Sequence, residues 1–187
     1  PTGSSYVWVE LPTLAGTNTY IWALWGNPDV SESPAACMTN GAAWNANYDA
    51  VWHLVGTNVA GVGFRCPDST FKRRHCSSAE TTTNALGLAG NSRGFNGTSS
   101  YLTASSNFLN NHAQITISEW VNPYTQVQGS RVALCGQNDL VEHGFQTNPM
   151  PMAWTPGGGQ IYPGVALTYN VWSHVVLVGD GTGMKMY

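Results

Sequence analysis

The sequence predicts an all-β fold, an antiparallel β-sandwich preceded by a β-hairpin segment. Its last eighteen residues alternate between two faces over 171–178, pass through a glycine-rich turn at 179–183 and resume at 184–187, as two paired strands do. Other short apolar segments recur between Gly, Pro and Asn residues, and none sustains the 3.6-residue period of a helix. About eight to twelve short strands separated by such turns favour a sandwich.

The predicted elements begin with a hairpin that joins 6–11 to 19–25 and carries aromatic residues on both strands. A loop that contains Pro34 and Gly41 follows, because both residues discourage regular structure. The remaining strands are expected at 48–54, 94–102, 113–121, 131–135, 140–146, 152–154, 164–168 and in the closing hairpin at 170–187.

Composition indicates an extracellular domain with a neutral, polar surface. Charged residues make up only 9% of the 187 residues, and the formal net charge is −3. The single basic run, 72–75, is expected to be a solvated loop, so nothing suggests a nucleic-acid partner. No apolar stretch is long enough to insert into a membrane. Because the chain opens on Pro1, we expect upstream sequence to have been removed or not seen.

The four cysteines suggest an oxidising compartment, although four thiols allow three pairings. Cys66 and Cys76 flank a polar loop with little apolar content, and a disulfide between them is the favoured pairing. Cys37 and Cys135 would then pair with each other. Zinc binding is the disfavoured alternative, since no Cys-x-x-Cys pair or close Cys/His array is present.

Several motifs carry a family resemblance. They are Gly-Phe-Asn-Gly-Thr-Ser-Ser-Tyr-Leu at 94–102, Ile-Thr-Ile-Ser-Glu-Trp-Val at 115–121, Trp-Ser-His-Val at 172–175 and Lys-Met-Tyr at 185–187. In this order they resemble laminin-G-like modules of the concanavalin A-like lectin/glucanase jelly rolls. The resemblance implies a jelly-roll domain over 46–187, incomplete at its C-terminus because the family adds one more strand after the position of Tyr187.

Residues 1–45 form the N-terminal hairpin segment and linker. Their motifs Val-Trp-Val-x-Leu-Pro and Ile-Trp-x-x-Trp-Gly-Asn-Pro are similar to the end of a domain of unknown function that is common in secreted microbial proteins. We expect this segment to pack on the jelly roll or on another chain, because an isolated hairpin is marginally stable.

The family includes glycosidases, but this sequence predicts no enzyme. Retaining relatives need two carboxylates about 5 Å apart, supplied by a Glu-x-Asp-x-x-Glu strand, and that triplet is absent. A Gly-x-Ser-x-Gly nucleophile turn is absent too. Alternation from Ile117 places Glu119 on the apolar face. A β-bulge before Trp120 that turns Glu119 to solvent is favoured, and a carboxylate facing sugar hydroxyls is the alternative.

Histidines 53, 143 and 174 are expected inside strands, and His174 is expected in the core, with its ring nitrogens bonded to backbone.

Candidate binding residues are aromatic and amide side chains near loop ends, which can stack on sugars and bond their hydroxyls. They are Trp154, Tyr162, Tyr169, Tyr124, Gln126 and Asn148.

The resemblance also implies one calcium ion at the rim of the sandwich, for which the candidate ligands are Asp139, Asn138, Glu142 and Asn96. A turn capped by Asn and Asp side chains is the alternative interpretation. Asn96 also begins a glycosylation sequon.

The sequence therefore predicts a secreted, non-catalytic recognition module that binds a glycan or cell-surface polysaccharide, or mediates adhesion. The alternative is a structural subunit of an extracellular fibre, surface layer or viral appendage, self-assembled by strand addition to the edge near Tyr187.

Overall fold

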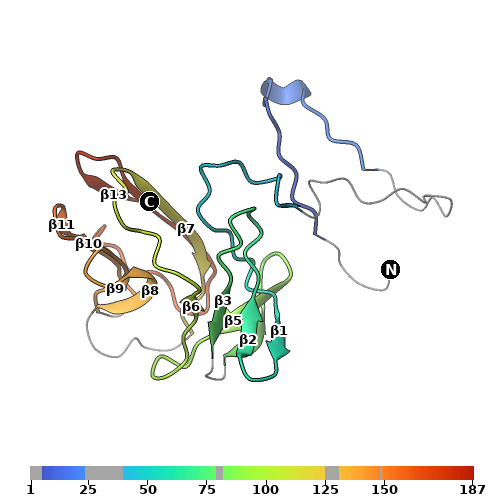
Figure 1. Cartoon of the computed structure of the whole chain (residues 1–187). Coiled ribbons are helices and arrows are strands. Elements are labelled where there is room, and N and C mark those ends of the chain that lie inside the picture. The colour runs from blue at the N-terminus through green and yellow to red at the C-terminus, as the bar shows by residue number, and fades with distance from the viewer. Residues whose placement is uncertain (1–5, 24–39, 79–81, 125–130, 148) are drawn as a thin grey trace. The chain divides into compact units, whose positions relative to one another are not determined.

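The computed structural model describes residues 6–23, 40–78, 82–124, 131–147 and 149–187. Its elements with described bounds are thirteen β-strands and one 3-10 helix, η1 (Gly16–Asn18). The strand pairings of the described residues are all antiparallel, which confirms the predicted all-β fold. The chain divides into two compact units, unit 1 (Pro1–Ser105) and unit 2 (Ser106–Tyr187) (Figure 1). The predicted domain boundary at residue 46 stays a prediction.

Unit 1 contains a four-stranded sheet and a separate two-stranded hairpin. The sheet has the order β1-β2-β3-β6 and the hairpin pairs β4 with β5. The strands are β1 (Thr57–Val59), β2 (Gly63–Cys66), β3 (Cys76–Ser78), β4 (Thr83–Leu86), β5 (Asn91–Gly94) and β6 (Thr103–Ala104). A small core lies against the sheet, formed by Phe64, Cys66 and Cys76 with Trp52, Leu54 and Leu102.

The predicted N-terminal hairpin is not formed within the described residues. Segments 6–15 and 19–23 belong to no strand there, and η1 lies between them. Trp8 stacks on His53 instead, with 4.5 Å between the ring centroids. Two short aromatic segments gain little from pairing only with each other, so this stacking contact with a distant part of the unit replaces the hairpin. The strand expected at 48–54 is also missing, apart from a single bridge between Trp52 and Asp68. The strand expected at 94–102 is not formed either, since residues 95–102 lie between β5 and β6 and belong to no strand.

Unit 2 contains two sheets. One has the order β11-β10-β9-β8 and the other the order β13-β12-β7. Their strands are β7 (Ile115–Val121), β8 (Val132–Gln137), β9 (Val141–Phe145), β10 (Pro151–Thr155), β11 (Gly159–Ile161), β12 (Ser173–Gly179) and β13 (Met184–Met186). The strand expected at 164–168 is not formed, whereas the other strands predicted from residue 113 onward are present.

The two sheets of unit 2 pack face to face. Val141 and Ala153 come from one sheet and Leu177 from the other, and all three are buried in one cluster. Partly buried apolar side chains complete it, namely Leu109, Ile115, Ile117, Ile161, Met184 and Met186. A core shared by facing sheets is the defining feature of a β-sandwich, so the predicted architecture is confirmed.

The closing hairpin is held by its turn. Asp180 Oδ1 accepts hydrogen bonds from the Thr182 hydroxyl, the Thr182 amide and the Gly183 amide, and these bonds lower the pKa of the carboxyl to about 2. Gly181 has a φ of 88°, a conformation that glycine adopts without strain.

In the part of the chain that the structure describes, no helix has the length and apolar character needed to cross a membrane.

Candidate functional site

A row of polar and aromatic residues crosses the outward face of the sheet formed by β8 to β11. Trp154 on β10 lies opposite Glu142 on β9 and opposite Gln160 on β11. Side chains alternate along a strand, and Val141 and Ala153 belong to the core. Glu142, Trp154 and Gln160 therefore share the face that points away from it.

Arg131, immediately before β8, completes this row. Its guanidinium Nη2 forms an ion pair with Glu142 Oε2, and its Cζ lies 5.3 Å from the centroid of the Trp154 ring. Its backbone amide donates to the carbonyl of Gln146. Gln146 also accepts a 2.5 Å hydrogen bond from the side chain of Gln160. The cation, carboxylate, indole and two amides thus form one connected group.

A pocket of about 210 Å³ lies along β8 and β9 beside this group, and both Arg131 and Glu142 line it. Three further lining residues, Ala133, Gly136 and Gly144, have a small side chain or none, which leaves room on the outward face. Gly136 has a φ of 155°, and a Cβ there would lie 2.1 Å from the Val141 carbonyl oxygen, so the backbone requires glycine. The volume corresponds to roughly seven water molecules at about 30 Å³ each.

This arrangement suits a small ligand with many hydroxyl groups. Glu142 accepts hydrogen bonds, Arg131 donates them, and neither is fully buried. Trp154 adds an apolar surface of the kind that packs against a sugar ring. The charges of Arg131 and Glu142 balance, which favours a neutral ligand over a charged one.

The structure brings together only part of the predicted sugar-binding set. Trp154 lies in the group, whereas Tyr162 is exposed just after β11, and Tyr124 is exposed three residues beyond the end of β7. Tyr169 is half-buried, and its hydroxyl has no hydrogen-bond partner in the described structure. Gln126 and Asn148 lie outside the described residues.

Arg131, Gln146 and Gln160 were missed. Arg131 and Gln146 stand at the ends of the predicted strands 131–135 and 140–146, whose alternation is the signal that could have found them. Gln160 lies on β11, which the sequence analysis did not predict.

The predicted calcium ligands make other contacts. Asn96 Oδ1 accepts from the amides of Thr98, Ser99 and Ser100, as in the alternative capped turn. The side chain of Asn138 donates to Asp139, and Glu142 pairs with Arg131. Among the described residues, no cluster of three His, Cys, Asp or Glu side chains could hold a metal. Calcium binding and glycosylation of Asn96 remain predictions.

The interpretation that a bulge turns Glu119 to solvent is wrong. The pairing of β7 with β12 is continuous from Ile115 to Val121, so alternation holds and Glu119 faces the interior. There Glu119 Oε1 lies 3.2 Å from Nδ1 of the fully buried His143 on the opposite sheet. Burial raises the pKa of Glu119 to about 7 and lowers that of His143 to about 4. The carboxyl of Glu119 thus faces the imidazole of His143 rather than solvent or a sugar.

Cys135 lies opposite His143 on β8. Burial, with the nearby Glu119 carboxyl, raises the pKa of its thiol to about 12. The thiolate is the reactive form, so Cys135 is a poor nucleophile. Cys37 lies outside the described residues, and its bond to Cys135 stays a prediction.

The prediction of a core His174 is also wrong. Leu177 and Val175 face the core, so His174 faces outward, where its ring stacks on the half-exposed Trp120 with 5.0 Å between centroids. The Ser118 hydroxyl lies 2.8 Å from His174 Nε2. The other sheet therefore also carries an outward aromatic group, and the alternation of 171–178 contained the signal for it.

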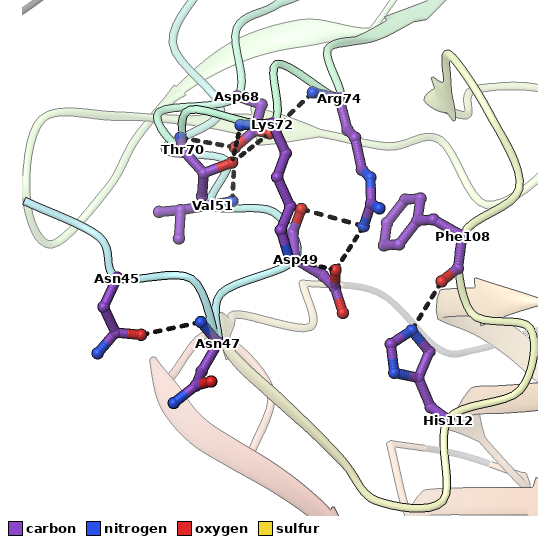
Figure 2. Close-up of polar contacts among 10 residues, drawn as sticks. All are labelled: Asn45, Asn47, Asp49, Val51, Asp68, Thr70, Lys72, Arg74, Phe108 and His112. Atoms are coloured by element: carbon purple, nitrogen blue, oxygen red, sulfur yellow. Dashed lines mark hydrogen bonds and ion pairs between the residues drawn. The ribbon is translucent and has the colours of Figure 1, made fainter. Parts of the chain in front are cut away.

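In unit 1, a buried carboxylate organises the loop that contains the basic run. Asp68 is fully buried and accepts hydrogen bonds from the amides of Val51, Thr70 and Arg74 and from the Thr70 hydroxyl (Figure 2). Burial alone would raise the pKa of Asp68, but these bonds outweigh it and the pKa is lowered. Lys72 and Arg74 both pair with Asp49, at 2.7 and 2.6 Å, so two residues of the basic run are anchored rather than freely solvated.

Glu119 and Glu142 are not placed as a pair of glycosidase carboxylates. Glu119 faces the interior, whereas Glu142 lies on the outward face of the other sheet. Two catalytic carboxylates must reach one sugar linkage from one cleft. These two cannot do so, because a sheet separates them.

One comparison with known proteins found a match, to a family model. Residues 96–187 match the laminin-G-like family model described as the concanavalin A-like lectin/glucanases superfamily. Searches of curated proteins and of solved structures found no match. The family match does not reach residues 1–45, whose resemblance to a domain of unknown function stays a prediction. Lectin-type domains of this family are usually non-catalytic. The sandwich and the family model agree, and residues 96–187 match the concanavalin A-like lectin/glucanase superfamily in sequence and fold class.

Proposed function

We propose that this chain is an extracellular, non-catalytic module that binds a neutral glycan, and so serves recognition or adhesion. The observation that carries the proposal is the connected group of Arg131, Glu142 and Trp154 beside the pocket on β8 and β9. The family match of residues 96–187 supports glycan binding in general, and the group supplies a chemically suitable place for it.

The bound unit is a single sugar ring or the end of a chain. The pocket is smaller than the roughly 300–1,000 Å³ of sites that enclose drug-sized ligands. Glu142 and Arg131 would share one pair of neighbouring hydroxyls, the carboxylate accepting and the guanidinium donating. Trp154 would cover an apolar face of the ring.

Binding to immobilised neutral polysaccharides and to their monosaccharides tests the proposal. We expect the wild-type chain to bind at least one of them, and Glu142→Gln and Trp154→Ala to weaken that binding about tenfold or more, equivalent to about 1.4 kcal/mol. Retained thermal unfolding midpoints would show that the variants fold.

Trp120→Ala is the matched control, because it removes an exposed tryptophan from the other sheet. It should leave binding unchanged. If Trp120→Ala abolishes binding while Trp154→Ala does not, the site is wrong although the function stands. A wild-type chain that binds no glycan of the panel contradicts the function itself.

The second candidate is a structural subunit assembled by strand addition. It is supported by β13, which pairs only with β12 and stands at one edge of its sheet among the described strands. An added strand from a neighbouring copy would pair with that edge. Electron micrographs of the purified chain distinguish the candidates, since a subunit forms fibres or layers and a binding module stays monodisperse.

A further inference from the structure

Cys66 and Cys76 lie directly opposite each other on the antiparallel strands β2 and β3. Both are buried in the core of unit 1, with exposed fractions of 0% and 4%, and no disulfide joins them in this structure. The two side chains are hydrogen-bonded to each other. The sequence suggested this pair because the cysteines flank a polar loop, whereas the structure supplies a different and stronger reason, the register of the sheet.

This register satisfies the geometric requirement of a disulfide. Directly opposed residues of an antiparallel pair have Cα atoms about 4.5–5.5 Å apart. Disulfides need a Cα separation of about 4.4–6.8 Å. The bond can therefore form without movement of either strand.

The loop between the two cysteines is already ordered without the bond. Asp68 collects four hydrogen bonds within and beside this loop, and Trp52 Nε1 donates to the carbonyl of Arg74. A disulfide therefore has little left to order in the loop, and the reduced pair has a well-packed place in the core.

We propose that Cys66 and Cys76 form a reversible disulfide, and that unit 1 keeps the same fold with the pair oxidised or reduced. The oxidant is a small-molecule or protein disulfide. The thiolate of one cysteine attacks it and releases a thiol, which leaves a mixed disulfide. The second cysteine, once deprotonated, attacks the first sulfur and expels the second thiol. Two protons and two electrons leave the pair, and the oxidant takes up both.

Oxidation should be slow in the folded protein, because neither sulfur is exposed. Strands β2 and β3 must separate locally before an external disulfide can reach Cys66 or Cys76. The remaining described cysteine, Cys135, lies in the other unit, and its thiol pKa of about 12 keeps it protonated. It serves as an internal control.

The test treats the full chain with oxidised glutathione or with a reductant, and then blocks free thiols under denaturing conditions. After oxidation we expect the peptides that contain Cys66 and Cys76 to be linked, with the loss of two hydrogens, while Cys135 is fully blocked. The circular dichroism spectra of the two states should coincide, and the oxidised state should unfold at a higher temperature. Cys135→Ser should keep this difference, and the double variant Cys66→Ser/Cys76→Ser should lose it.

Three results would overturn the proposal. The first is that both cysteines remain blockable after exhaustive oxidation. The second is a bond from either one to Cys37 or Cys135. The third is a reduced chain whose spectrum shows loss of the fold. All three are read from the wild-type chain, so the test does not depend on whether the variants fold.

Discussion

Glu119 and His143 meet between the two sheets of unit 2, with 3.2 Å between Oε1 of the carboxyl group and Nδ1 of the imidazole. The contact is too poorly aligned to count as a hydrogen bond, and Glu119 Oε1 and both ring nitrogens have no other partner among the described residues. The pair lies beside Cys135 in an otherwise apolar interior. Its protonation should therefore influence the stability of the sandwich.

The two groups respond to pH in opposite directions. Glu119 has a pKa raised from 4.5 to about 7, so its contribution to stability is present below pH 4.5 and is lost as the pH rises through about 7. His143 has a pKa lowered from 6.5 to about 4, so its contribution is present above pH 6.5 and is lost as the pH falls through about 4. Between pH 4.5 and 6.5 the two slopes cancel, and the wild-type free energy of unfolding should be nearly flat there.

Single variants should remove this cancellation. Glu119→Gln leaves His143 alone, and stability should then fall as the pH decreases from 6.5 to about 4. His143→Gln leaves Glu119 alone, and stability should fall as the pH rises from 4.5 to about 7. Each loss should approach roughly 3 kcal/mol, at about 1.4 kcal/mol per pH unit. Urea unfolding at several pH values measures both slopes. Parallel pH profiles for wild type and variants would contradict the opposite pH dependences of Glu119 and His143.

Asp68→Asn should destabilise unit 1 by about 2–3 kcal/mol. The amide group of Asn can accept hydrogen bonds at one position only, whereas both Asp68 oxygens accept. The replacement therefore leaves buried donors of Thr70 or Arg74 without an acceptor. Asp49→Asn is the control, because its partially exposed pairs with Lys72 and Arg74 should contribute less than about 1 kcal/mol. Chemical denaturation compares the two, and equal effects would contradict the central role of Asp68.

Gly136→Ala should destabilise the sheet at the pocket by a few kcal/mol, because the added Cβ meets the Val141 carbonyl oxygen at 2.1 Å and the φ of 155° is unfavourable for alanine. Gly157→Ala is the matched control, since nothing lies within 4 Å of its Cβ position. Thermal unfolding should show a large decrease for the first variant and little change for the second. Equal midpoints would mean that β8 and β9 move apart easily.

Trp120 and His174 should show a favourable coupling of about 0.5–1 kcal/mol, because they are opposed cross-strand residues with stacked rings. A double-mutant cycle with Trp120→Ala and His174→Ala measures it. Ser118→Ala should reduce the coupling, because the hydroxyl that contacts His174 Nε2 is removed. A coupling of zero would show that the stacked geometry is not maintained in solution.

The sequence predicted best the features that depend on local alternation. The strands at 113–121 and 170–187 and their turn could be located, because their apolar period and the Gly-Asp-Gly turn are written in consecutive residues. Alternation placed Glu119 correctly in the interior. The bulge was nevertheless favoured, because burying a lone carboxyl is costly. The residue that Glu119 faces, His143, lies on a strand of the other sheet and could not be inferred from local alternation.

The outward groups were harder to predict for a similar reason. Trp154 was found from its residue type, but its neighbours Arg131 and Gln160 depend on the register of four strands, which a single sequence does not fix. The N-terminal hairpin failed because its apolar residues can also pack elsewhere, as Trp8 does on His53. Contacts between residues that are far apart in the sequence therefore decide which of several possible local structures forms.

The pairing of β7 with β12 sets the order in which unit 2 can fold. These strands share seven residue pairs, yet residues 122–172 lie between them in the chain. The intervening strands β8 to β11 pair with their sequence neighbours, so they can form as a meander after closing only short loops. Docking of β12 on β7 must close a loop of about fifty residues, and such non-local contacts slow folding. The step that completes the sandwich, and buries Glu119 against His143, should therefore be the slow one.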